Sequence, residues 1–140
     1  NGYRVLRNPV PGLAQLREAA PERGRLDGTE QTPVAVAPQS DCSFEIGAIS
    51  GVLELRAGKH SIRFDAGSGT LSFENGRSCR LTGKELKFRL LADTTTMEFF
   101  FADGIACTYM RKPEDRSLTI AGRAQVRYTK WALRSIWPGR

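Results

Sequence analysis

Two carboxylates, Asp93 and Glu98, lie five residues apart in LLADTTTMEFFFADG (90–104) and could in principle do acid–base chemistry. A pair that cleaves glycosidic bonds needs carboxyl groups about 5 Å or about 6.5–9.5 Å apart across a cleft, one with a raised pKa. Side chains an odd number of positions apart point to opposite faces of a continuous strand. If Thr94–Thr96 form a bend instead, Asp93 closes one strand and Met97 begins the next. We therefore expect both carboxylates to be structural and predict no catalytic residue here.

Histidine and cysteine chemistry has few candidates. His60 is the only histidine, and it lies in AGKHSIRF, where the start of a hairpin strand favours a surface position over a catalytic base. The three cysteines, Cys42, Cys79 and Cys107, are widely spaced and form no CxxC pair. They predict buried thiols, with one disulfide as the alternative. We expect no metal and no cofactor, and this cysteine usage favours a cytoplasmic compartment over a secreted one.

Size and charge limit the function classes further. A chain of 140 residues fits one domain that removes about two thirds of its unfolded surface from water. The net charge of +6 is spread along the sequence, and the densest basic run is only KWALRSIWPGR. Because basic residues and aromatics interleave only in RYTKWALR, and no stretch is apolar for the length of a membrane span, we expect neither a nucleic-acid nor a membrane partner.

The elements that must position these residues are strands. Apolar and polar residues alternate with period two in SFEIGAI, VLELR, SIRFD, TLSFE and ELKFRLLAD. Turn signals separate them, among them ISG, RAGK, DAGSG, Asn75-Gly76 and Asp103-Gly104. Because nothing helical lies between them, the pattern predicts an all-β fold: a two-layer antiparallel β-sandwich of the jelly-roll or concanavalin type with nine or ten short strands.

The first 32 residues differ from the rest. NGYRVLRNPV opens in an extended pattern without a Met, as expected of a cut through a larger polypeptide, and PGLAQLREAAP predicts one short helix. The polar stretch 22–32, ERGRLDGTEQT, predicts a loop. We therefore predict a connector over residues 1–32 and a β-sandwich domain over residues 33–140.

One predicted strand is apolar on both sides. Met97, Phe99 and Phe101 share one face, whereas Phe100 lies with Glu98 on the other. A strand that is apolar on both sides is usually buried on both sides. In a sandwich the second side needs another body to cover it.

These residues also carry a family resemblance. KFRLLADTTTMEFFFADGIACTY resembles a signature of the C-terminal β-sandwich of the β-fructosidases, a glycoside hydrolase family of invertases, inulinases, levanases and sucrose-6-phosphate hydrolases. That signature reads L-R-hydrophobic-hydrophobic-V-D-R-S-S-V-E-V-F-x-N-D-G. The positions that match are Arg89, Asp93, Thr95, Thr96, Glu98, Phe100, Asp103 and Gly104.

Three further segments match in the same order. YRVLRNPVPGLAQLR resembles the family's connector between domains, SIRFDAGSGTLSFE its hairpin, and GRAQVRYTKWALRSIW its closing strand. Departures are Thr94 where the family has Arg, Met97 where it has a β-branched residue, and Glu74-Asn75 in place of D-R. They affect contacts of the missing arginines and leave the strand pattern intact.

The resemblance implies a non-catalytic role. In this family the chemistry belongs to an N-terminal five-bladed β-propeller with W-M-N-D-P-N-G, R-D-P and E-C motifs, none of which occurs here. The implied function is to pack on and stabilise the propeller of an enzyme that hydrolyses sucrose or fructans, and that propeller is the expected partner. An exposed apolar face also offers a route to homo-oligomers. The expected docking residues are Leu13, Leu16, Arg17, Glu98 and Phe100.

An autonomous module that binds carbohydrate, for example a fructan, is the alternative function. Such modules present aromatic rings for sugars to stack on, and the candidates are Trp131 and Trp137, with Tyr128 nearby. In an unbroken strand, Tyr128 and Trp131 point to opposite faces, while Trp131 and Trp137 share one. Core packing or edge sealing is the more usual role of each ring.

Overall fold

The structure, a computed structural model, describes residues 21–28, 31–36, 39–92, 96–101, 106–111 and 117–133. Within these ranges the chain forms strands and turns, without a helix, so no helix here could cross a membrane. The ten strands are β1 (Glu22–Gly28), β2 (Gln31–Ala35), β3 (Ser40–Ala57), β4 (His60–Asp65), β5 (Thr70–Phe73), β6 (Ser78–Arg80), β7 (Leu86–Ala92), β8 (Thr96–Phe101), β9 (Ala106–Arg111) and β10 (Ser117–Ala132).

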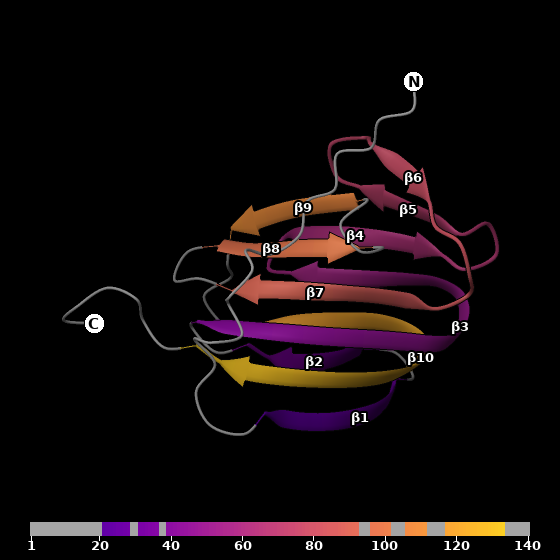
Figure 1. Cartoon of the computed structure of the whole chain (residues 1–140). Helices are drawn as coiled ribbons and strands as arrows, with labels where there is room; N and C mark the ends of the chain where they lie inside the picture. The colour runs from indigo at the N-terminus through magenta and orange to yellow at the C-terminus, as the bar shows by residue number, and fades with distance from the viewer. Residues whose placement is uncertain are drawn as a thin grey trace.

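All ten strands belong to one antiparallel sheet that branches at β3 (Figure 1). β10 pairs with one edge of β3 along nearly its whole length and with β1 and β2 on its own other edge. On the second edge of β3, Ser40–Ile46 pair with β7 and Val52–Ala57 pair with β4. The β7 branch continues through β8 and β9, and the β4 branch through β5 and β6. In Figure 1 the β4 strand lies largely behind the β7 branch.

A bend in β3 separates the two branches. Ala48 has φ 50° and Gly51 has φ 77°, and the pairing of β3 with β10 shifts register around Arg123. The sequence predicted a turn at residues 49–51 that ends one strand and starts another, and this prediction is wrong. Because β10 pairs with β3 on both sides of the bend, the backbone hydrogen bonds continue and the left-handed residues act as an irregularity inside one long strand.

The core lies on the face that the alternating apolar residues share. Phe44 and Phe88 stack at 4.8 Å between ring centroids, and Phe88 lies 5.3 Å from Phe101. The Phe73 ring of β5 is 6.2 Å from Phe101 of β8, although these strands are not hydrogen-bonded neighbours. The largest fully buried side chains are Phe44, Phe64, Phe99, Phe101, Ile46, Leu53, Leu55, Ile62, Leu71, Leu86, Leu90 and Met97. The predicted inward face of each period-two segment is confirmed, except that Phe73 is half-buried.

The all-β, antiparallel part of the predicted fold is confirmed, as is the turn at Asn75-Gly76, where the Gly76 N–H donates to the Phe73 carbonyl at 3.1 Å. The two-layer arrangement stays a prediction. The predicted helix, which was expected to stop at Pro21, falls on residues before 21 and so lies outside the described residues. The predicted loop over residues 22–32 is wrong for residues 22–28, which form β1, and for Gln31 and Thr32 in β2. The alternation R-G-R-L was too short to predict a strand. The strand forms because residues 22–28 pair with the distant strand β10. The division of the chain at residue 32 stays a prediction.

Candidate functional site

The face of β1, β10, β3, β7 and β8 that points away from the core, here the outer face, holds the candidate site. Strand pairing arranges its side chains in rows across the sheet. One row joins Trp131, Asp41, Leu91 and Glu98, and the next joins Thr129, Ser43, Arg89 and Phe100. Residues side by side in such rows have Cβ atoms about 4.5–5.5 Å apart, so their side chains touch or nearly touch.

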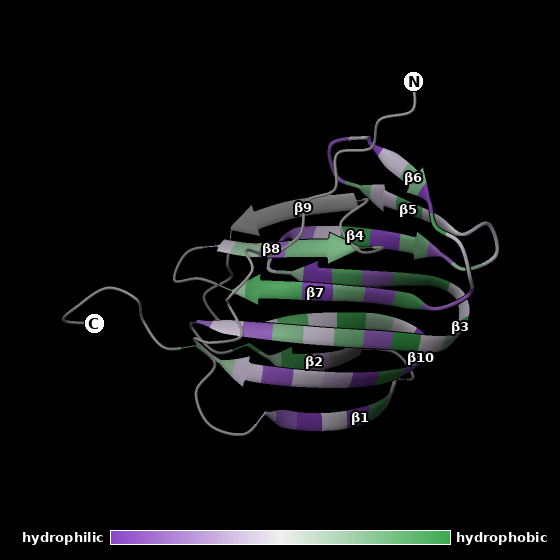
Figure 2. Cartoon of the chain, viewed as in Figure 1, coloured by the Kyte–Doolittle hydropathy of each residue, from purple (hydrophilic) through white to green (hydrophobic). Residues whose placement is uncertain are grey.

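One end of the outer face mixes apolar groups with charge. Leu91, Phe100 and Trp131 are half-buried there, and Glu98 beside them is exposed. We call these four residues, with Asp41 and Arg89, the mixed patch. In Figure 2, which colours whole strands, β8 is green over most of its length because Phe100 adds to the inner-face residues Met97, Phe99 and Phe101, whereas β1 is largely purple. The outer face around β7 and β8 therefore holds half-buried apolar side chains among its charged ones.

The centre of the mixed patch is an ion pair with a buried acid. The Arg89 Nη2 donates to Asp41 Oδ2 at 2.8 Å, and the Asp41 side chain is 0% exposed while that of Arg89 is 38% exposed. A carboxylate loses several kcal/mol of hydration when it is buried, and a partner with good geometry must offset that loss. The Asp41 side chain is thus shielded from water, although it lies on the outer face, away from the core.

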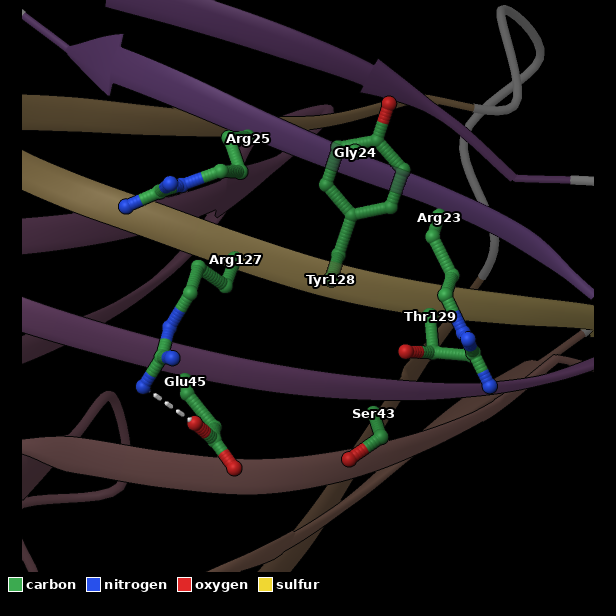
Figure 3. Close-up of a pocket in the computed structure, with 8 residues that line it drawn as sticks. All are labelled: Arg23, Gly24, Arg25, Ser43, Glu45, Arg127, Tyr128 and Thr129. Atoms are coloured by element: carbon green, nitrogen blue, oxygen red, sulfur yellow. Dashed lines mark hydrogen bonds and ion pairs between the residues drawn. The ribbon is translucent and has the colours of Figure 1, made fainter.

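The other end of the outer face is a groove lined by arginines (Figure 3). It encloses about 500 Å³ between side chains of β1, β10 and β3. We call it the arginine groove. Its charged and hydroxyl-bearing lining residues are Arg23, Arg25, Arg127, Glu45, Ser43 and Thr129. The Arg127 Nη2 donates to Glu45 Oε2 at 2.7 Å, and both side chains are well exposed.

The structure does not bring the two predicted carboxylates into a described pair. Glu98 is exposed, and its register partners are Leu91 and Tyr109, neither of which is acidic. Asp93 lies outside the described residues. As predicted, Glu98 and Phe100 point away from the face of Met97, Phe99 and Phe101, each of which is 0% exposed. Among the described residues, no three His, Cys, Asp or Glu side chains gather as a metal site would require.

His60 and two cysteines occupy structural positions. His60 Nδ1 lies 2.9 Å from Glu74 Oε2, and this hydrogen bond, with one from the Ser61 N–H, lowers the pKa of Glu74 below its ordinary value. Burial raises the pKa of the Cys42 thiol to about 11, and burial also raises that of the half-buried Cys79. Both are free thiols, as expected for structural cysteines, and a raised pKa makes them poor nucleophiles.

Aromatic residues of β10 divide between the two faces, as predicted. Tyr128 points inward, 6.1 Å from the Phe44 ring, and covers Gly24, where an added Cβ would lie 2.2 Å from the tyrosine ring. Trp131 lies on the outer face, in the row of Asp41 and Leu91. Trp137, Leu13, Leu16 and Arg17 lie outside the described residues.

Sequence reasoning missed the arginine groove and the buried acid. Arg23 and Arg25 fell in a stretch that was assigned to a loop, and only the R-G-R alternation signalled that both share a face. Asp41 lies just before the segment SFEIGAI, and no sequence pattern singled it out. Neither site is visible in the sequence, because each depends on pairing with residues 48 to about 100 positions away.

Comparison with known proteins gives a fold likeness. No protein-family model matches the sequence, and no curated protein matches it either. Among solved structures, the exo-inulinase of Aspergillus awamori superposes with a TM-score of 0.70 at 11% identity, covering 96% of this chain and 33% of that one. The GH32 β-fructofuranosidase BmSUC1 of Bombyx mori gives 0.64 at 18% identity, covering 96% and 31%. The galectin LEC-6 of Caenorhabditis elegans gives 0.54 at 9% identity, covering 79% of this chain and 95% of that one.

The chain therefore spans about a third of the length of the fructan- and sucrose-enzyme structures that it matches. The matched third is their C-terminal β-sandwich domain, so the resemblance drawn from the sequence is confirmed at the level of fold. At these identities the likeness concerns the fold, and activity has to be argued from this chain's own residues.

Proposed function

We propose that this chain is the non-catalytic β-sandwich of a β-fructofuranosidase-type glycoside hydrolase, which packs on and stabilises a β-propeller that carries the active site. The two branches of the sheet then form the two layers. The contact between Phe73 on β5 and Phe101 on β8 supports this arrangement, since it joins the branches through their side chains alone. Sheets that pack face to face bury one face of each strand in this way.

The observation that carries the docking role is the apolar part of the mixed patch. Leu91, Phe100 and Trp131 are half-buried on the side of the sheet away from the core, around the buried carboxylate of Asp41. An antiparallel sheet that met only water on this side would carry polar residues there. A contact between two domains of one chain typically buries about 600–1,500 Å², which a patch of this kind can anchor.

The propeller is the partner that the family resemblance implies. The connector proposed over residues 1–32 would then lead from the propeller into the sheet, with β1 already paired to β10. Leu13, Leu16 and Arg17 of the connector, with Glu98 and Phe100 of β8, are the proposed docking residues. An exposed mixed patch in a chain without its propeller is also the proposed route to homo-oligomers.

The coding sequence upstream of Asn1 tests this proposal most directly. A reading frame that continues into W-M-N-D-P-N-G, R-D-P and E-C motifs supports it, and a frame that encodes an unrelated domain contradicts it. In a protein that contains both units, Phe100→Asp should lower the melting temperature of the whole and release the propeller as an independent transition. The matched control is Val52→Asn, which makes an exposed residue of β3, 39% exposed, polar without placing a second carboxylate beside its cross-strand partner Asp65.

A second candidate function, a fructan-binding module, is favoured by the position of Trp131. Trp131 lies on the outer face in the same row as Asp41 and Leu91, where a sugar ring could stack on its indole. Titration of the 140-residue chain with levan or inulin, followed by tryptophan fluorescence, tests this function. Binding predicts a saturable shift that Trp131→Ala abolishes, and an unchanged spectrum contradicts it.

A further inference from the structure

The arginine groove is built from two rows of three side chains on the outer face. Strand pairing places Arg23, Thr129 and Ser43 in one row and Arg25, Arg127 and Glu45 in the next. Figure 3 shows the two hydroxyl groups lying between Arg23 on one side and the Arg127–Glu45 pair on the other. Three guanidinium groups therefore border one groove that holds a single carboxylate.

This arrangement places like charges side by side. Arg25 is the direct cross-strand partner of Arg127, and like charges in that position destabilise a sheet. Glu45 offsets only Arg127, at 2.7 Å. Among the described ion pairs and hydrogen bonds, none involves the side chain of Arg23 or Arg25. The groove thus retains an excess of two positive charges and two guanidinium groups with free donors.

We propose that the arginine groove binds an anionic group of the phosphate or sulfate class. Guanidinium groups present rigid forks of N–H donors that match the oxygens of such groups, two bonds at a time. Arg25 and Arg127 would hold the anion from adjacent strands, and Arg23 would reach it from the next row. The hydroxyls of Ser43 and Thr129 offer further donors on the floor of the groove.

Glu45 competes with the anion for Arg127 in this site. Its carboxylate fixes the Arg127 guanidinium at one edge of the groove and keeps part of its charge occupied while no anion is bound. The site goes beyond the docking role, because it shares no residue with the mixed patch, although both include residues of β3 and β10. About 500 Å³ of open groove admits an anionic group carried on a small saccharide as well as a free anion.

Isothermal titration of the 140-residue chain at fixed ionic strength tests the proposal. The probes are inorganic phosphate, inorganic sulfate and a sulfated disaccharide, with the unsulfated disaccharide as the blank. Saturable binding of any sulfated or phosphate probe, weakened about tenfold or more in the Arg23→Gln/Arg25→Gln double variant, supports the site. Binding of the inorganic ions identifies a free-anion site, and binding of the disaccharide alone identifies a saccharide-borne group.

Two further variants separate a specific loss of anion binding from a general effect on charge or folding. Arg63→Gln removes an exposed arginine from β4 and should leave the affinity unchanged, because Arg63 does not line the groove. Glu45→Gln should strengthen binding about threefold, since it removes the competing carboxylate, and a gain of affinity cannot come from misfolding. Absence of saturable binding by every probe, or equal losses in the groove variant and in Arg63→Gln, would overturn the proposal.

Discussion

The two faces of β8 come from alternate residues of one strand, yet their environments differ. Met97, Phe99 and Phe101 are 0% exposed on the inner face, whereas Phe100 is half-buried and Glu98 exposed on the outer face. The inner rings pack against Phe88, with Phe99 at 5.9 Å and Phe101 at 5.3 Å between centroids. The inner face therefore stabilises the fold, and the outer face remains available to a partner. Apolar character alone does not distinguish the two roles; burial does.

The largest effect should come from exchanging neighbouring phenylalanines. Phe99→Ala removes a fully buried ring and should cost about 3–5 kcal/mol of unfolding free energy, since the site cannot collapse to fill the space. Phe100→Ala removes an identical side chain from the half-buried face and should cost about 1 kcal/mol or less in this chain. Urea denaturation of both variants measures the difference. Equal losses would show that the two faces of β8 are equally packed.

Ion pairs allow the same comparison with charged groups. Asp41→Ala should lower the free energy of unfolding by about 2 kcal/mol, because it leaves Arg89 without its buried partner. The loss is smaller than in a fully buried pair, since the Arg89 side chain is 38% exposed. Glu45→Ala breaks a pair of similar length, 2.7 Å, whose side chains are 59% and 45% exposed, and should cost about 0.5 kcal/mol or less. Thermal unfolding of the two variants measures both losses. A larger loss for Glu45→Ala would contradict the role of burial.

Two glycines, Gly24 on β1 and Gly47 on β3, test how tightly each face of the sheet is packed. At Gly24 an added Cβ would lie 2.2 Å from the Tyr128 ring, so Gly24→Ala should displace the ring and cost about 1–3 kcal/mol. At Gly47 the nearest atom would be Glu85 Oε1 at 3.4 Å, so Gly47→Ala should change stability little. The near-ultraviolet circular dichroism of Tyr128's environment should change in the first variant only. A tolerated Gly24→Ala would mean that the ring moves freely.

The period-two alternation of apolar and polar residues predicted the features that depend only on nearby positions in the sequence. The inward residues of the five alternating segments, such as Phe88 and Leu90, could be named because each segment determines its own faces. The bend at Ala48 and the strand at residues 22–28 could not, because both depend on pairing with β10, about 70 to 110 positions away. The arginine groove was missed for the same reason. Long-range register brings Arg25 beside Arg127, and no local pattern encodes it.

The smallest effect on stability should come from the exposed hydrogen-bonded pair His60–Glu74. Among these contacts, it is expected to contribute least because water reaches both side chains. The hydrogen bonds from His60 and from the Ser61 N–H hold the pKa of Glu74 below its ordinary value of 4.5. A carboxylate whose pKa is lowered on folding adds stability that is fully present above its unfolded pKa, and that stability is lost as the pH falls through the folded pKa.

Because Glu74 is 45% exposed, this contribution should be only a few tenths of a kcal/mol. The gap in unfolding free energy between the parent chain and Glu74→Gln should therefore be measurable at pH 7 and should shrink as the pH falls through the folded pKa of Glu74, where its carboxylate becomes protonated. A gap that widens towards pH 3 would mean that Glu74 is stabilised in its protonated form, against the direction that its two hydrogen-bond donors dictate.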